Sequence, residues 1–338
     1  MQLVLAALLV AQALPALPTS GSRLFLDHAP LTLQLATDLR ALFRDRGEHK
    51  KDHPATLRYG TAPDTGSLNV KLRTRGIFRL ARCGFPPIRL DLPSHQLEDT
   101  PFAGQDKLKL VTHCQSGQSF ERNLLREYAV YRVFNALTDT SFRVRLVHIT
   151  YLDSAHHDTV TRYGFLIESD VELAGRLDAE VVETAKVHDL VTDPSYMTLV
   201  AVFQYLIGNT DWSVWARHNI AIVSAKAEPH PLFAVPYDFD YSGAVGAPYA
   251  IPPQTLPIHS VRERLYRGYC QPDTILNVVF ARFRSAKDSV YAAVRAVPDL
   301  SERDVRGLLD YFDDFYRAID NRSVVQRDFV RGCRTVPQ

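Results

Sequence analysis

The sequence predicts an α+β protein of two lobes, a strand-rich N-terminal lobe followed by a helical C-terminal lobe. Three observations support this fold class. Short segments that alternate apolar and polar residues fill much of the first half, which is typical of half-buried strands. One long amphipathic helix pattern interrupts them, and helix patterns dominate the second half. Two acidic loops follow apolar runs in that second half.

Composition places the chain among ordinary globular proteins. It has 338 residues, of which 46% are hydrophobic, with 39 basic and 38 acidic side chains. This length suggests roughly two domains or lobes. A net charge of +1 gives no electrostatic reason to bind nucleic acid or an anionic membrane, so we expect neither as a partner. The sequence shows no internal repeat or low-complexity segment.

Residues 1–20 are similar to a secretory signal peptide. An apolar run over 3–10 precedes small residues at Ala11 and Ala13 and a proline at Pro15. The run is too short to span a membrane, and we expect no other transmembrane segment. The leader lacks a basic residue at its start, and the alternative is a buried N-terminal helix. We expect an exported protein, periplasmic or extracellular.

The four cysteines fit an oxidising compartment. Their wide spacing excludes the close Cys-x-x-Cys pairs of zinc sites, and it allows one or two disulfides. The sequence does not determine the pairing, and buried free thiols are the alternative for each. The cysteines are Cys83, Cys114, Cys270 and Cys333.

The N-terminal lobe is predicted over 67–170, after an extension at 21–66. Apolar residues recur with a helical period from Leu31, which predicts a helix over 31–46 in the extension. Within the lobe, alternation and bounding prolines predict strands, and one amphipathic stripe predicts a helix. The predicted strands run over 68–75, 83–93, 106–114, 142–152 and 163–169, and the helix over 120–137.

The C-terminal lobe is predicted over 171–338. Its apolar residues recur with the helical period, and Gly208 marks the end of one helix. The predicted helices run over 179–190, 196–207, 261–269, 273–283 and 305–319.

The two acidic loops supply the candidate functional residues. The first, GNTDWSVWARHN, contains Asp211 and Asn219, and the second, VPYDFDYSG, contains Asp238 and Asp240. All four side chains offer hard oxygen atoms, which suit Mg²⁺ or Mn²⁺ better than Zn²⁺. The alternative is structural, because Asp and Asn often cap helices or occupy solvated turns. The combination predicts a site for a metal and a nucleotide.

Cations on the predicted strands are candidates for holding phosphates. Arg89 and Lys109 each stand between apolar neighbours. Such a side chain reaches phosphate only where it points into a cleft. Pointing to solvent, which is the commoner case, it merely forms the polar face of a half-buried strand.

From about Leu68 to Ile319 the sequence resembles the CotH-like atypical kinases, the spore-coat kinases and their relatives. The resemblance rests on the order of short motifs, and the GNTD…N loop also looks like that of the HipA-type toxin kinases. The motifs are an Arg-Gly pair after the first strand, then PIRLDL, KLKLVTHC, YGFLIES, GNTDWS…HN and PYDFDYSG.

The resemblance implies a bilobal protein-kinase-like fold, with ATP and Mg²⁺ or Mn²⁺ as cofactors. Asp211 would be the catalytic residue that accepts or orients the proton of the substrate hydroxyl. Asn219 and Asp238 would bind the metal, with Asp240 a second carboxylate nearby. The phosphates would be held by Lys109 or Arg89, with neither preferred, and the helix partner of that cation would be Glu127 ahead of Glu121.

The departures from the kinase pattern leave two alternatives open. The sequence has no Gly-rich phosphate loop, VAIK or HRD, and its interval from Asp211 to Asn219 is longer than the corresponding loop of protein kinases. The alternatives are an exported pseudokinase or binding protein without transfer activity, and a metal-assisted hydrolase. The expected activity is transfer of phosphate from ATP to a hydroxyl of a protein or of a cell-envelope component. The acceptor and the oligomeric state are beyond the sequence.

Overall fold

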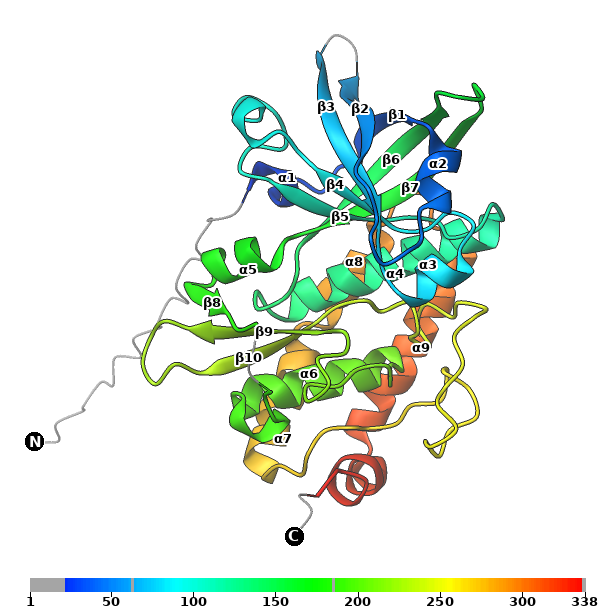
Figure 1. Cartoon of the computed structure of the whole chain (residues 1–338). Coiled ribbons are helices and arrows are strands. Elements are labelled where there is room, and N and C mark those ends of the chain that lie inside the picture. Colours follow the sequence, from blue (N-terminus) through cyan, green and yellow to red (C-terminus); the bar gives the residue numbers. More distant parts are fainter. Residues whose placement is uncertain (1–21, 62–63, 184–185, 336–338) are drawn as a thin grey trace, which may run out of the picture.

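The computed structural model describes residues 22–61, 64–183 and 186–335. It is an α+β protein with a closed, mixed β-barrel in its N-terminal part and a helical C-terminal region (Figure 1). This confirms the predicted α+β class and the order of a strand-rich part before a helical part. The predicted leader lies outside the described residues.

The barrel contains seven strands within the described residues, in the order β1-β2-β3-β4-β5-β7-β6. Neighbouring strands are antiparallel, except that β1 pairs with β6 in parallel and closes the barrel. The five strands predicted from alternation are confirmed as β3 to β7. The strands are β1 (Leu31–Thr37), β2 (His53–Thr61), β3 (Asp64–Thr74), β4 (Ile88–Asp91), β5 (Lys107–Val111), β6 (Val144–Asp153) and β7 (Thr159–Ile167).

The predicted helix over 31–46 is wrong in its first half. Residues 31–37 form β1, and α2 (Leu39–Arg44) begins only after Asp38, whose Oδ1 accepts a hydrogen bond from the Ala41 N–H at 2.8 Å. Leucines four positions apart are compatible with both periods, because every second residue of a strand also lies on one face. Pairing of β1 with both β2 and β6 decides for the strand.

The longer predicted helices are confirmed at 120–137, 196–207, 273–283 and 305–319. The sequence did not predict the short helix between β3 and β4, nor α8. The described helices are α1 (Arg23–Leu26), α3 (Phe78–Arg82), η1 (Ser94–Gln96), α4 (Gln118–Leu137), α5 (Asp170–Arg176), η2 (Asp189–Val191), α6 (Pro194–Ile207), α7 (Asp273–Ser285), α8 (Lys287–Arg295), α9 (Glu302–Asp320), α10 (Arg322–Val325) and the π-helical η3 (Gln326–Arg331).

Two predicted helices are wrong. The segment predicted over 179–190 starts with the strand β8 (Ala179–Val181) and reaches η2 near its end. The segment predicted over 261–269 contains a turn and an isolated β-bridge at Tyr269 but no helix. There the Arg264 side chain donates to the Leu206 carbonyl at 3.2 Å, so contacts with α6 hold this segment in place of internal helical hydrogen bonds.

A second, small sheet carries the candidate loops. Strands β9 (Ile220–Ala225) and β10 (Leu232–Pro236) form an antiparallel hairpin, and β8 pairs with the other side of β9. In Figure 1 this hairpin lies below the barrel, near α5 and α6.

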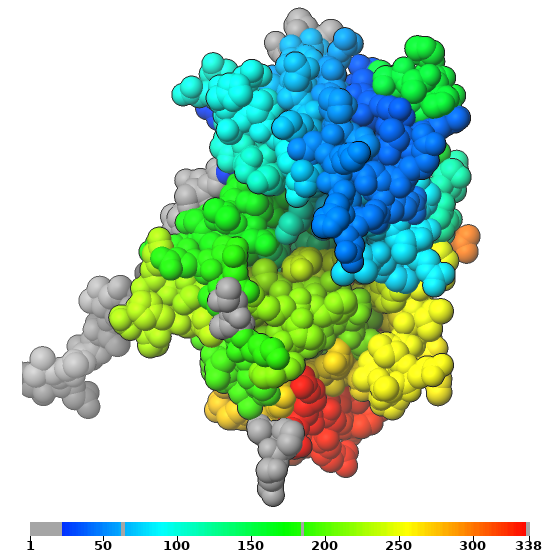
Figure 2. Space-filling model, in the orientation of Figure 1, coloured from blue at the N-terminus to red at the C-terminus, as the bar shows by residue number. Residues whose placement is uncertain are grey.

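Apolar side chains form two clusters, one inside the barrel and one in the helical region. Helix α4 belongs to the second cluster, with Leu124, Tyr131 and Phe134 buried, and it runs beneath the barrel strands (Figure 1). The space-filling view shows the blue and cyan atoms of the N-terminal part seated on the green to red atoms of the C-terminal region (Figure 2).

Two disulfides are present, Cys83–Cys114 and Cys270–Cys333. They hint at an oxidising environment, which fits the predicted export without establishing it. Among the described residues, none of the helices has both the length and the apolar character needed to cross a membrane.

Candidate functional site

The two acidic loops lie side by side because hydrogen bonds join their glycine ends. Helix α6 ends at Gly208, whose φ of 64° is the left-handed conformation that glycine adopts readily. Gly243 donates its N–H to the Gly208 carbonyl at 3.0 Å, and Ala244 donates to the Ile207 carbonyl at 3.0 Å. The loop after α6 and the loop after β10 are therefore held together at this point.

The β9–β10 hairpin brings Asn219 and Asp238 to one end of the small sheet. Ile220 of β9 pairs with Pro236 of β10, and the Tyr237 N–H donates to the Asn219 carbonyl at 3.0 Å. Asn219 precedes the hairpin and Asp238 follows it. Both have positive φ, 55° and 59°, which Asn and Asp tolerate better than most residues.

Asp211 joins this pair through its side chain. Its Oδ2 accepts a hydrogen bond from Asn219 Nδ2 at 3.1 Å, and its Oδ1 lies 2.8 Å from His218 Nε2. The Asp211 N–H donates to Asn209 Oδ1 at 3.0 Å, which fixes the turn after α6. The amide of Asn219 is thereby oriented so that Nδ2 points to Asp211. Within the described residues, its Oδ1 accepts no hydrogen bond.

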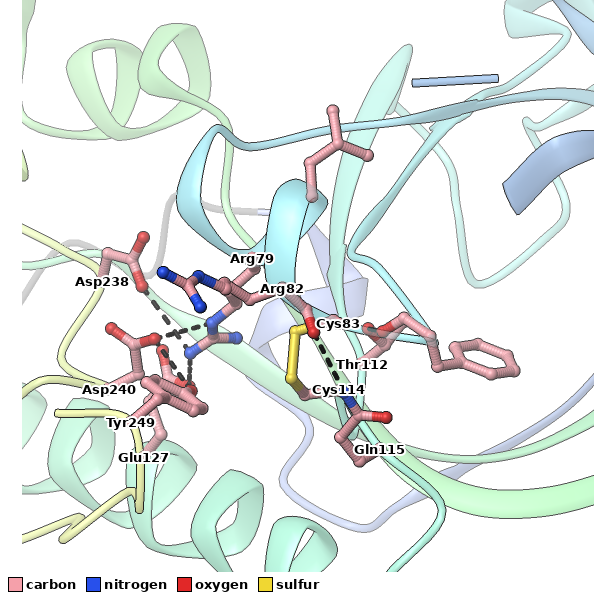
Figure 3. The surroundings of a disulfide bond; sticks show 12 residues. Arg79, Arg82, Cys83, Thr112, Cys114, Gln115, Glu127, Asp238, Asp240 and Tyr249 are labelled. Atoms are coloured by element: carbon pink, nitrogen blue, oxygen red, sulfur yellow. Dashed lines mark hydrogen bonds and ion pairs between the residues drawn. A yellow bond between two sulfur atoms is a disulfide. The ribbon is translucent and has the colours of Figure 1, made fainter. Parts of the chain in front are cut away.

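A buried arginine links the barrel to the second acidic loop. Arg79, on α3, lies 2.5 Å from Glu127 of α4 through Nη2 and 2.8 Å from Asp240 through Nε. The same Nη2 lies 3.7 Å from Asp238 Oδ1. Figure 3 shows the three carboxylates around this guanidinium, with Tyr249 beside Asp240. The Tyr249 hydroxyl donates to Asp240 Oδ2 at 3.0 Å.

The surrounding protein and neighbouring carboxylates raise the pKa of Glu127 and of Asp238. Burial raises the pKa of Glu127, although the Arg79 guanidinium opposes the shift. Desolvation by the protein around the half-open Asp238 side chain raises its pKa, and the neighbouring Asp240 carboxylate acts in the same direction. Burial would lower the pKa of Arg79, but Asp240 and Glu127 raise it well above its usual value. The arginine therefore stays charged and supplies the positive charge that the carboxylates require.

Asp238 is the most accessible carboxylate of this group. Its side chain is 42% exposed, against 6% for Asp240 and 2% for Glu127. The buried Tyr131 of α4 anchors its backbone, because the Asp238 N–H donates to the Tyr131 hydroxyl at 2.8 Å. Asp238 is thus fixed in place while its carboxylate remains open to a ligand.

The two predicted phosphate-binding cations are paired with other carboxylates. Lys109 Nζ lies 3.0 Å from Asp170 Oδ1, and 5.5 Å from the ring centroid of Tyr237, next to Asp238. Arg89 pairs with Asp91 two residues along its own strand at 2.7 Å. Neither contacts Glu127, whose cation in this structure is Arg79.

Neither of the two helix glutamates pairs with Lys109 or Arg89. Glu127 is buried at Arg79. Glu121 instead accepts a hydrogen bond from the Tyr163 N–H at 2.7 Å, on β7. The two residues lie on different faces of α4.

The open side chains of this site fit a hard divalent cation only if a substrate supplies further oxygen ligands. No group of three or more His, Cys, Asp or Glu side chains in the described part of the chain could hold a metal ion. Asp240 is occupied by Arg79 and Tyr249. The oxygen atoms left open are those of Asn219 and Asp238, a small set that suits Mg²⁺ or Mn²⁺ when phosphate oxygens complete the coordination.

Sequence reasoning missed Arg79 and His218. His218 stands beside Asn219 in the loop GNTDWSVWARHN. A loop that brings Asn219 back to Asp211 therefore also brings His218 close to Asp211. Arg79 had one weak signal, a run of arginines at 75, 79 and 82 spaced to lie on one helical face. Among known proteins, no protein-family model and no curated protein matches the chain.

Proposed function

We propose that this chain is a metal-dependent phosphotransferase that moves the γ-phosphoryl group of ATP to a hydroxyl acceptor. One observation carries the proposal. The β9–β10 hairpin places Asn219 and Asp238 at the same end of the small sheet, with Asp211 hydrogen-bonded to Asn219. One carboxylate for the nucleophile beside two oxygen donors for a metal is what phosphoryl transfer requires of a protein.

Each residue has a distinct role in this proposal. Asp211 orients the acceptor hydroxyl and takes its proton while the new oxygen–phosphorus bond forms and the bond from the γ-phosphorus to ADP breaks. Asn219 and Asp238 would hold the metal, and Mg²⁺ or Mn²⁺ bound there would supply positive charge to the phosphates. His218 contacts Asp211 and positions it.

The wider fold is consistent with a bilobal protein-kinase-like plan. The Arg79–Asp240 contact joins the N-terminal barrel part to the loop after β10, so the candidate residues lie where the two parts meet. The resemblance to CotH-like kinases stays a prediction. The proposed acceptor is a hydroxyl of a protein or of a cell-envelope component, in keeping with the predicted export.

Ligand-induced stabilisation tests the proposal. Melting of the wild-type protein is measured with ATP, with Mg²⁺ or Mn²⁺, and with both together. Ligand at 100 times its dissociation constant stabilises by about 2.7 kcal/mol, which raises the melting temperature by several degrees. We expect stabilisation only when nucleotide and metal are both present.

Two variants sharpen this test. Asp238→Ala should abolish the stabilisation, and Asp106→Ala, which changes an exposed carboxylate paired with Lys107, should keep it. Transfer of labelled γ-phosphate to a hydroxyl substrate is then measured. Binding without transfer would favour a pseudokinase, release of phosphate to water alone would favour a hydrolase, and no effect of metal and nucleotide would reject the site.

A further inference from the structure

The segment that delivers Arg79 to the carboxylates carries two more arginines. Arg75 follows directly after β3, and Arg79 and Arg82 lie on α3. Arg79 and Arg82 are three positions apart and so lie on one side of α3, whereas Arg75 precedes the helix. One short segment between β3 and Cys83 therefore carries three guanidinium groups.

Only Arg79 of these three is matched by carboxylates. In the described residues, the guanidinium groups of Arg75 and Arg82 form no ion pair and no hydrogen bond. Arg82 is exposed, with its guanidinium 5.9 Å from the ring centroid of Phe78. Figure 3 shows the side chains of Arg79 and Arg82 both extending from α3 toward Asp238.

Arg75 is half-buried, so its lack of a partner has an energetic cost. Burial lowers the pKa of Arg75, while Asp238 is the carboxylate that most opposes this shift. The backbone of Arg75 is fixed, because its N–H donates to the Pro87 carbonyl at 2.9 Å. A fixed, partly desolvated guanidinium near an open metal-binding carboxylate is a favourable place for an anion.

The chain beyond Arg82 anchors this segment firmly. Cys83 ends α3 and is bonded to Cys114, just after β5. Gln115 Nε2 donates to the Arg82 carbonyl at 3.0 Å, and the Phe85 N–H donates to the Cys114 carbonyl at 2.9 Å. These contacts, which Figure 3 shows in part, hold α3 against the strand that leads into α4. The arginines are thus presented from a rigid support.

We infer that Arg75 and Arg82 bind the polyphosphate of the nucleotide, one from inside the site and one from its opening, while Arg79 organises the carboxylates. This inference rests on the proposed function and assigns its phosphate-binding cations to residues other than Lys109 and Arg89. The two guanidinium groups would bind phosphate oxygens that also coordinate the metal held by Asp238. Their planar donors match phosphate in a way that a lysine ammonium does not.

Calorimetric titration of the full chain with Mg²⁺ and ATP, ADP, AMP or inorganic tripolyphosphate tests this. We expect Arg75→Ala and Arg82→Ala each to weaken ATP and tripolyphosphate binding about tenfold or more, and AMP binding much less, because charge-assisted hydrogen bonds to the outer phosphates are lost. Arg75→Lys should recover part of the loss. Arg58→Ala, which removes an exposed arginine from β2, is the matched control and should leave every affinity within about twofold.

The outcomes separate this inference from the proposed function. Wild-type protein that binds Mg²⁺–ATP, with unchanged affinity in both arginine variants, would overturn the inference and leave the proposed function standing. Equal losses for AMP and tripolyphosphate would also overturn it, because they would indicate a structural role. A wild-type protein that binds none of these ligands would reject the proposed function, and the assignment of the arginines with it.

Discussion

The N–H of Gly243 donates a hydrogen bond to the carbonyl of Gly208 at 3.0 Å, and both glycines press against the hydroxyl of Tyr311. This contact fixes the distance between the loop that carries Asp211 and the loop that carries Asp238. The geometry of the candidate site therefore depends on two positions where a side chain has no room.

Gly243→Ala is expected to destabilise the protein. The new Cβ would lie 2.4 Å from the Val261 carbonyl oxygen and 2.8 Å from the Arg262 Cα, and backbone atoms cannot rotate away. Such overpacking costs about 1–3 kcal/mol. Urea unfolding checks this beside Gly307→Ala in α9, where the Cβ meets nothing within 4 Å and alanine should stabilise by about 0.5–1 kcal/mol. Equal stability of Gly243→Ala and the wild type would contradict the packing described here.

Arg79→Met is expected to destabilise the protein strongly. It would leave Glu127 and Asp240 buried without their cation, and breaking a buried pair from one side costs about 3–5 kcal/mol. Since protonation relieves the unpaired carboxylates, the loss should shrink as the pH falls. Arg306→Ala, which breaks an exposed pair with Glu302, should change stability little. A small effect of Arg79→Met at neutral pH would show that these carboxylates are not charged in the folded protein.

Asp211→Asn is expected to abolish phosphate transfer while sparing nucleotide binding. The amide can still accept a hydrogen bond from Asn219, but it cannot take a proton, so the rate should fall by about hundredfold or more. Labelled-phosphate transfer and melting with Mg²⁺–ATP are measured on the same samples, with Asp106→Asn as the control. Turnover equal to that of the wild type would exclude Asp211 as the catalytic residue.

His113 is expected to make the protein less stable in mild acid. Burial lowers the pKa of this histidine from 6.5 to about 4, and its Nδ1 has no partner in the described residues. Because the unfolded chain takes up the proton first, stability is fully present above pH 6.5 and is lost as the pH falls toward 4. The loss from this group amounts to about 2 kcal/mol between pH 7 and pH 5.

Urea unfolding at several pH values measures this dependence. His113→Phe should remove that part of the pH dependence and keep the aromatic contact with Phe85, whose ring centroid lies 4.5 Å away. His95→Gln, at an exposed position, should keep it. An unchanged pH profile in His113→Phe would contradict the prediction.

The fold was predictable where a local pattern and its tertiary surroundings agree. The alternating Leu68, Val70 and Leu72 correctly predicted the strand β3, because these three side chains face the barrel interior. The apolar stripe of α4 correctly predicted a helix, because its side chains are buried in the apolar cluster of the helical region. Residues 31–37 show the limit, since leucines spaced by four fit a helix and a strand equally, and only the pairing with β2 and β6 resolves the ambiguity.

The candidate site was predictable in part. Asp211, Asn219 and Asp238 carry local signals, because each stands at a turn beside a strand or helix end. Arg79 carries none of comparable strength, since its partner Asp240 lies 161 positions away and α3 is too short to show a helical period. Long-range ion pairs of this kind depend on how elements pack, which a single sequence does not reveal.

Closure of the barrel also determines where another chain could add a strand. Every barrel strand has neighbours on both sides, and β1 and β6 complete the ring. The ring is not paired along its whole length, however. Residues 64–70 of β3 pair with β2 alone and residues 159–164 of β7 pair with β6 alone, so each stretch leaves one strand edge open to pairing with another chain. The small sheet adds two further edges, at β8 and β10, and both of these strands are short.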